Sequence, residues 1–178
     1  MANETVINGA TGERLERKNT ITVVEWDNTA MGGTANTREV LGVRTEDSSL
    51  EFNPDVSTST DILGKTYTDI NKTEPQQSFD PYNLIGGSKL GAYLLQNALE
   101  NNINAYNGKF SVYIITTALG TAGAYYAVKH TGCSVIPQSV GGDSYNNMPI
   151  EVHLSNNITV GTVDKLADDF EFTAKVTV

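Results

Sequence analysis

The sequence predicts a mainly β domain, a β-sandwich or barrel with one flanking α-helix. Three observations lead to this fold class. Thr, Asn, Gly and Ser are abundant, short strand-like runs recur along the chain, and only one segment has helical periodicity. Many strands around one helix must close into a barrel or stack as two sheets to bury their apolar faces. The 178 residues suffice for one such domain with arms.

The predicted strands are short strand-like runs separated by turn residues. The clearest ones cover residues 21–26, 110–115, 125–130, 133–136, 150–154, 158–163 and 170–178. Residues 119–123, Leu-Gly-Thr-Ala-Gly, predict the turn of a hairpin. We expect residues 1–36 to form an extended N-terminal arm with one strand and a loop, and residues 37–178 to form a single domain with long loops.

The segment of residues 40–81 predicts strands that bury little. Residues 50–53 alternate between apolar and polar, and residues 53–55, Asn-Pro-Asp, indicate a turn. Residues 61–70 alternate without a continuous apolar face, which predicts a strand that is half exposed in a monomer and suits a sheet shared between subunits. Residues 74–81, bracketed by two prolines, predict an extended connector.

The one segment with a helical pattern covers about residues 88–101. Ser88 is the predicted N-cap, because it follows two glycines and precedes the first apolar residue of the pattern. Leu90, Leu94 and Ala98 share one face of the predicted helix. One amphipathic helix is too little for a bundle, so we expect it to cover one side of a sheet.

The net charge is −9, from 21 acidic and 12 basic residues. Phosphate groups would be repelled by such a surface, which argues against general nucleic-acid binding but allows DNA to pass nearby without adhering. The single cysteine, Cys133, excludes an intrachain disulfide. No secretion signal and no apolar run of about 20 residues is visible, so we expect folding in a reducing cytoplasm and no membrane contact.

The residues that could carry chemistry do not form a known pattern. His130 and His153 lie in strand-like runs without the spacing of a zinc or calcium site. The acidic pairs at residues 46–47 and 168–169 are sequence neighbours, which point to opposite faces of a strand and make no catalytic dyad there. No phosphate-binding loop or nucleophile elbow is present. We therefore expect no catalytic residue, no cofactor and no metal, and predict that the protein is not an enzyme.

Several segments resemble the major tail proteins of tailed phages and prophages. The resemblance lies in residues 43–55 and 60–71, continues through 72–81 into the predicted helix, and extends to residues 136–143. The resemblance lies in the general character of these segments and in the order of the predicted elements, without an invariant motif. It covers most of the chain beyond about residue 40.

The resemblance implies a tail tube protein, related in fold to the tube proteins of type VI secretion. Six subunits would close into a ring, and the rings would stack into a tube within the virion, assembled in the host cytoplasm. The implied partners are copies of the chain itself, a tape-measure protein enclosed by the tube, and tail terminator and baseplate proteins. Genomic DNA would pass through the lumen during infection without specific binding.

Acidic residues are distributed unevenly along the chain. Residues 41–82 carry eight acids and three bases, whereas residues 83–140 carry one acid and three bases. If the acidic strands line the lumen, like charge would let DNA slide without adhering. The candidate lumen-facing residues are Glu51, Asp61 and Asp69. The alternative is that these acids face bulk solvent.

Two alternative functions stay open at this point. The first keeps the architecture: the inner tube of a contractile tail or of a phage-tail-like bacteriocin, which conducts no DNA. The second is a capsid-decorating or carbohydrate-binding β-sandwich module. The sequence leaves open the host, the helical parameters of a tube and the oligomeric state of the free subunit.

Overall fold

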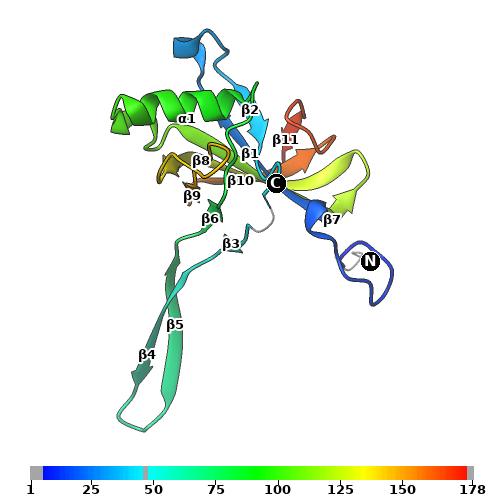
Figure 1. The fold of residues 1–178 in the computed structure, drawn as a ribbon. Helices are drawn as coiled ribbons and strands as arrows, with labels where there is room; N and C mark the ends of the chain where they lie inside the picture. Colours follow the sequence, from blue (N-terminus) through cyan, green and yellow to red (C-terminus); the bar gives the residue numbers. More distant parts are fainter. Residues whose placement is uncertain (1–5, 46–47, 176–178) are drawn as a thin grey trace.

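The computed structural model describes residues 6–45 and 48–175. The described chain is mainly β, with a large antiparallel sheet arranged as a β-sandwich and one α-helix, α1 (Lys89–Leu99), against it, which confirms the predicted fold class (Figure 1). The strands of the large sheet are β1 (Thr20–Trp26), β2 (Thr37–Val40), β3 (Leu50–Glu51), β6 (Gln76–Phe79), β7 (Phe110–Thr121), β8 (Ala124–Pro137), β9 (Ile150–His153), β10 (Ile158–Val163) and β11 (Phe172–Ala174). A separate hairpin consists of β4 (Pro54–Thr60) and β5 (Thr66–Thr73). Three short 3₁₀ turns are η1 (Arg17–Asn19), η2 (Thr29–Met31) and η3 (Ile103–Ala105).

The large sheet runs in the order β2-β1-β7-β8-β9-β6-β3, and β10 pairs with both β8 and β11. Strand β8 is the junction, since its first part pairs with β10 and its last four residues pair with β9. Gly132 lies between these parts with φ of +84°, and the β7–β8 register shifts there. A glycine bulge bends a strand in this way. The two strands predicted over residues 125–130 and 133–136 are therefore one bent strand.

The two faces of the central strands bury two separate cores, because side chains alternate along each strand. Val24 and Trp26 of β1 enter the larger core, which lies on the side of α1, whereas Val23 enters a smaller one. The smaller core consists of Val23, Tyr113, Ile115, Ala127, Val163 and Phe170. The body of the molecule is thus held by two apolar clusters on opposite faces of β1 and β7.

Helix α1 lies where the sequence predicts it. The Ser88 hydroxyl accepts a hydrogen bond from the backbone N–H of Gly91 at 2.9 Å, as an N-cap does. Leu90 and Leu94 are fully buried in the larger core. The buried face also includes Tyr93 and Asn97, whose polar atoms bond to neighbouring backbone and side-chain groups, so the packed face is wider than the leucine pattern indicates.

The prediction of a connector over residues 74–81 is wrong, because this segment contains β6, which pairs with β3 on one side and β9 on the other. Phe79 is 1% exposed and Gln77 is 2% exposed. The Gln77 amide is buried with its hydrogen bonds satisfied: its oxygen accepts from the Thr22 hydroxyl at 2.7 Å, and its nitrogen donates to the Ser48 hydroxyl at 3.0 Å. A buried strand that carries a glutamine lacks the apolar pattern that would have predicted it.

Two further predictions in this region are corrected by the structure. Residues 61–70 are not one strand, because residues 61–64 form the turn of the hairpin and β5 begins at Thr66. The predicted turn at residues 53–55 is limited to Asn53, which has φ of +41°, while Pro54 already begins β4. The strands therefore lie on either side of a turn that the sequence places inside a strand.

The termini extend from the sheet with different roles. The strand predicted within residues 1–36 is β1, which pairs with both β2 and β7. The described residues before Arg17 form an exposed arm, tied to β7 where Asn8 bonds to Thr117, Ala118 and Gly120. The predicted last strand over residues 170–178 is represented by the three residues of β11, and residues 176–178 lie outside the described chain. The division of the chain at residue 36 stays a prediction.

Candidate assembly interface

The β4–β5 hairpin projects away from the body of the molecule (Figure 1). Every residue of both strands is exposed. The hairpin pairs with no other strand of the described chain, so it neither continues the large sheet nor contributes to either core. Two hydrogen bonds close its base. The backbone N–H of Glu74 donates to the backbone carbonyl of Asn53 at 3.4 Å, and the side-chain amide of Asn53 donates to the backbone carbonyl of Glu74 at 3.2 Å.

The two faces of the hairpin differ in chemistry. The register pairs Val56 with Ile70, Thr58 with Thr68 and Thr60 with Thr66, which places six β-branched side chains on one face. The opposite face carries Ser57 paired with Asp69 and Ser59 paired with Tyr67. β-branched residues suit a pleated surface that is packed against a neighbour. We therefore define the first set as the β-branched face, and treat it as a candidate interface.

The turn of the hairpin is closed by the Asp61 carboxylate together with two backbone hydrogen bonds, from the Asp61 N–H to the Lys65 carbonyl and from the Gly64 N–H to the Asp61 carbonyl. Oδ1 of Asp61 accepts the backbone N–H groups of Leu63 and Lys65, both at 2.9 Å. Oδ2 of Asp61 accepts the Tyr67 hydroxyl at 3.2 Å. The hydrogen bond from the Lys65 N–H is the main cause that lowers the pKa of Asp61 below its ordinary value. Gly64 supplies the left-handed residue of the turn, with φ of +78°.

This turn presents two aliphatic side chains to solvent. Ile62 is 102% exposed and Leu63 is 87% exposed. Because hydrogen bonds close the turn, the backbone that carries both side chains is ordered before any contact is made. A binding element that is ordered in advance loses less entropy on contact with a partner. We call residues 61–65 the hairpin tip.

The three acids predicted to face a lumen lie on three different elements. Glu51 is in β3 and accepts a hydrogen bond from the Gln76 amide at 3.3 Å. Asp69 is on the polar face of β5, and Asp61 is at the hairpin tip. Glu51 and Asp69 are exposed, while the carboxylate of Asp61 is committed to the turn. The structure does not gather the three into one site.

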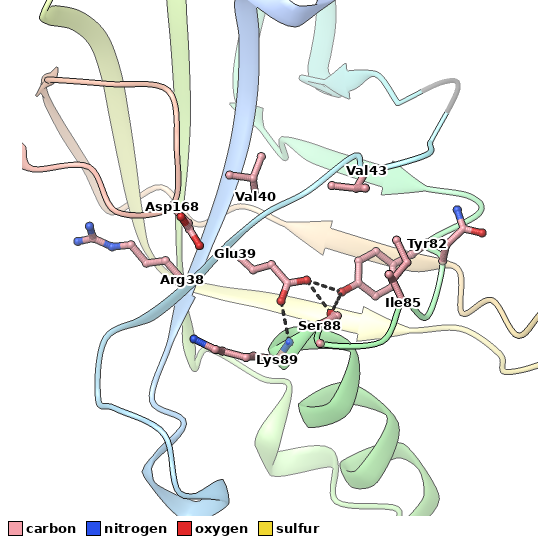
Figure 2. A pocket seen from close by; sticks show the side chains of 11 residues that line it. Arg38, Glu39, Val40, Val43, Tyr82, Ile85, Ser88, Lys89 and Asp168 are labelled. Atoms are coloured by element: carbon pink, nitrogen blue, oxygen red, sulfur yellow. Dashed lines mark hydrogen bonds between the residues drawn. The ribbon is translucent and has the colours of Figure 1, made fainter.

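A cavity of about 290 Å³ lies between β2, the segment before α1 and the first turn of the helix (Figure 2). Its apolar lining includes Val40, Val43 and Ile85, of which Val43 is 60% exposed and Ile85 is 38% exposed. The charged side chains around it are Arg38, Glu39, Lys89 and Asp168. We call this hollow the β2–α1 cavity.

Glu39 organises one wall of the β2–α1 cavity. Its Oε1 accepts the hydroxyls of Tyr82 at 3.0 Å and Ser88 at 2.7 Å, and its Oε2 accepts the backbone N–H groups of Lys89 at 2.8 Å and Leu90 at 3.1 Å (Figure 2). A carboxylate is favourable at a helix N-terminus, where the first N–H groups have no partner within the helix. Burial, with the Glu39 charge as a smaller cause, raises the pKa of Tyr82 above its ordinary value.

The smaller core is edged by a second charged cluster. Glu25 is 8% exposed and accepts from Arg38 at 2.5 Å, from Lys129 at 3.4 Å and from the Tyr113 hydroxyl at 3.2 Å. Arg38 also donates to the Phe170 carbonyl at 2.7 Å, which ties β2 to the segment before β11. The sequence did not indicate this cluster or the Glu39 cluster, because their members are tens of residues apart and show no shared motif.

The remaining predicted polar residues have ordinary surroundings. His130 Nδ1 lies 2.8 Å from the Ser155 carbonyl, and His153 lies 3.3 Å from Glu151. Asp169 pairs with Lys165 at 2.7 Å. The acidic pair at residues 46–47 lies outside the described residues.

Neither a metal-binding cluster nor a membrane-spanning helix occurs within the described residues. Across residues 6–45 and 48–175, no three His, Cys, Asp or Glu residues lie close enough together to hold a metal ion. Over the same part of the chain, no helix has the length and apolar character needed to cross a membrane.

Comparison with known proteins yields distant structural likenesses. No family model matches the chain, and no curated protein matches it. Similar solved structures include the sheath/tube terminator of an extracellular contractile injection system (TM-score 0.49, 12% identity, covering 85% of this chain and 99% of that chain). The sheath-tube complex of such a system gives 0.47, 13%, 86% and 95%, and the tube-terminating cap of the anti-feeding prophage gives 0.45, 15%, 87% and 95%. All three likenesses have TM-scores below 0.5 and identities of 15% or less.

Proposed function

We propose that the chain is a structural subunit that assembles with copies of itself into the tube of a phage tail. The observation that carries the proposal is the β4–β5 hairpin, a preformed element that is exposed along its whole length and has no partner surface among the described residues. The sequence resemblance to major tail proteins supplies the kind of assembly.

The hairpin has the physical properties of an assembly element. A lone two-stranded hairpin is only marginally stable in water. Val56 and Ile70 on its β-branched face, and Ile62 and Leu63 at its tip, would each gain by leaving water. Contact with another copy provides that burial, and it would also stabilise the hairpin.

Edge strands support the same proposal. Strands β2, β3 and β11 each pair with a single strand within the described residues. Unpaired edges favour further strand pairing, and a neighbouring subunit in a ring can supply the partner. A heterologous contact of this kind closes into a ring when its rotation closes, and a second heterologous contact stacks the rings.

In the proposed tube, six copies form each ring and the stacked rings enclose a tape-measure protein. Terminator and baseplate proteins bind its ends, and the genome passes through it during infection. The particle is a virion assembled in the host cytoplasm. We keep the division of the chain at residue 36 as part of this proposal, and the N-terminal part that it defines includes β1, which pairs within the large sheet.

The lumen proposal is carried by Glu51 and Asp69, since the carboxylate of Asp61 is taken up by the hairpin turn. Exposed carboxylates that face DNA would repel phosphate and keep the genome sliding. In a particle whose tail contains this chain, the E51Q/D69N variant should eject DNA more slowly or less completely. Unchanged ejection would count against a lumenal position for these acids.

The proposed function is tested by negative-stain electron microscopy and sedimentation of the purified protein over a range of concentrations. Rings of six subunits or tubes are expected at high concentration. A chain that stays monomeric at every concentration and binds glycans would overturn the proposal in favour of a carbohydrate-binding module.

A further inference from the structure

The chain contains two exposed asparagine–glycine pairs, Asn8–Gly9 and Asn107–Gly108. An asparagine in front of a glycine can lose its side-chain amide without an enzyme. The backbone nitrogen of the glycine attacks the carbonyl carbon Cγ of the asparagine, ammonia leaves, and a cyclic imide forms. Glycine favours this step, because no Cβ shields its nitrogen and its backbone is permissive. The structure surrounds the two pairs with different hydrogen bonds.

The fold protects the amide of Asn8. Its nitrogen donates to the Thr117 carbonyl at 3.0 Å and to the Gly120 carbonyl at 2.8 Å. A side-chain amide has two N–H donors, so both are bonded to β7. Ammonia cannot leave from this position without the loss of both hydrogen bonds. We therefore expect the folded chain to slow the reaction at Asn8.

The side chain of Asn107, in the loop between η3 and β7, is bound through its carbonyl oxygen instead. The Ser134 hydroxyl donates to Oδ1 of Asn107 at 3.3 Å. Among the described residues, no acceptor lies within hydrogen-bond distance of the Asn107 amide nitrogen, which is the leaving group. A hydrogen bond to a carbonyl oxygen stabilises the negative charge that develops there when the carbon is attacked. The contact with Ser134 therefore favours attack at Cγ.

The same hydroxyl contacts the attacking nitrogen. Oγ of Ser134 accepts the backbone N–H of Gly108 at 3.0 Å. One hydroxyl thus binds both reacting groups, and it can take the proton of the Gly108 nitrogen while its own proton passes to Oδ1 of Asn107. The space at Gly108 is open, because a Cβ built there would lie 3.9 Å from the nearest atom outside its chain neighbours, the Gly132 carbonyl oxygen.

We propose that Asn107 and Gly108 form a self-modification site, at which the Ser134 hydroxyl promotes loss of the Asn107 amide. A bond forms between the Gly108 nitrogen and Cγ of Asn107. Collapse of the intermediate restores the carbonyl and breaks the bond from Cγ to the amide nitrogen, which takes the transferred proton and leaves as ammonia. Water then opens the imide at either carbonyl, and position 107 becomes an aspartate or an isoaspartate.

The product adds a negative charge to one face of the sheet. Ser134 of β8 is the cross-strand partner of His153 of β9. His153 is in turn the partner of Gln76, and Gln76 is the partner of Glu51. Cross-strand partners point to the same face. Since Asn107 contacts the Ser134 side chain, a carboxylate at position 107 lies on the same face as Glu51.

Peptide mapping by mass spectrometry, after long incubation of the dilute folded protein at mildly alkaline pH, tests the proposal. The mass change from an amide NH₂ to a hydroxyl identifies each modified asparagine. Asn107 should be modified at least about tenfold faster than Asn8, which has to lose two hydrogen bonds. An equal rate at the two positions, or a faster rate at Asn8, overturns the proposal.

The urea-unfolded chain is the matched control, because both asparagines precede glycine there and neither has its folded surroundings. The two should then react at similar rates. A preference for Asn107 that is as large in the unfolded chain as in the folded one would assign the difference to the flanking sequence and overturn the role of the fold. The reaction takes place within one chain, so the result is decided whether or not copies assemble.

Variants of Ser134 test the role of the hydroxyl. S134A should slow the modification of Asn107 about fivefold, the rate equivalent of one hydrogen bond. S134T keeps a hydroxyl and should restore the rate, while Asn8 in the same chains should react as in the parent. Circular dichroism checks that both variants are folded. An unchanged or faster rate at Asn107 in folded S134A overturns the role of Ser134. If S134A does not fold, the comparison of Asn107 with Asn8 in the parent still decides whether the site exists.

Discussion

The body of the molecule and the β4–β5 hairpin use the same residue types in opposite ways. In the body, Val23 and Val24 of β1 are 0% exposed and lie on the two faces of the sheet. In the hairpin, Val56 is 51% exposed and Ile70 is 67% exposed. Both regions are regular antiparallel pairs, so strand formation alone does not distinguish them. The difference is the second layer, which the body contains and the hairpin lacks.

This difference separates folding from assembly. Apolar side chains of the body have already left water, so their substitution should unfold the subunit. Those of the hairpin remain in water, so their substitution should leave the subunit folded and act only when copies meet. Four predictions follow this division, from the largest expected effect on the free energy of unfolding to the smallest.

Truncation of a core aromatic should have the largest effect. Phe110 is 1% exposed and packs edge-on against Tyr93 at a centroid distance of 6.0 Å. F110A should lower the free energy of unfolding by about 3–5 kcal/mol, since it removes the ring and leaves a cavity. Denaturant titration followed by circular dichroism measures this. A loss below about 1 kcal/mol would mean that the larger core does not hold the body.

Removal of the Glu39 carboxylate should have an intermediate effect. E39A leaves two helix N–H groups and two hydroxyls without their acceptor, and should cost about 1–3 kcal/mol. The control is E100A at the other end of the helix region, where an exposed side chain should change stability by less than about 0.5 kcal/mol. Equal losses of stability from the two substitutions would show that the Glu39 carboxylate does not stabilise the fold through these hydrogen bonds.

Polar substitution on the β-branched face should leave the subunit folded but prevent its assembly. V56S/I70S should change the free energy of unfolding by about 1 kcal/mol or less, because both side chains are already exposed. Sedimentation at high concentration should show loss of oligomers. L99S, which also replaces an exposed aliphatic side chain, is the control and should assemble as the parent does. A V56S/I70S protein that assembles normally would show that the face is not an interface.

Acid should loosen the hairpin tip without unfolding the body. The pKa of Asp61 is lowered in the folded chain, so its contribution is present above the ordinary value of 3.8 and is lost as pH falls through the lower folded pKa. Hydrogen exchange at the amides of Leu63 and Lys65 should quicken in that range, relative to their intrinsic rates, and should already be faster at neutral pH in D61A. Protection of both amides that is the same in D61A as in the parent would show that the carboxylate does not hold the turn.

Features that depend on residues close in sequence could be predicted, and features that depend on distant residues could not. Helix α1 was predicted well, because Ser88, Leu90 and Leu94 are close in sequence and each has a local signal. Strands β1, β7, β9 and β10 were predicted from their own strand-like runs of residues. Their partners and the bend at Gly132 were not predictable, since pairing depends on residues far apart in the chain.

The candidate interface could be located by sequence but not described. The weak burial pattern of residues 40–81 indicated half-exposed strands, and the hairpin lies there. The position of its turn was missed because Asp61 and Gly64 lie within an alternating run. The β2–α1 cavity gave no signal, because Val43, Ile85 and Lys89 come from separate segments that only the fold brings together.

Deletion of the hairpin is the most direct test of whether the β4–β5 hairpin drives self-assembly. The hydrogen bonds between Asn53 and Glu74 show that the two ends of the hairpin are adjacent, so residues 54–73 can be replaced by a short Gly-Ser loop. Negative-stain microscopy and sedimentation of this variant and its parent are then compared at matched concentrations. Rings or tubes are expected from the parent, and folded monomers with an unchanged unfolding transition are expected from the variant. Tubes from the hairpin-deleted chain would contradict it.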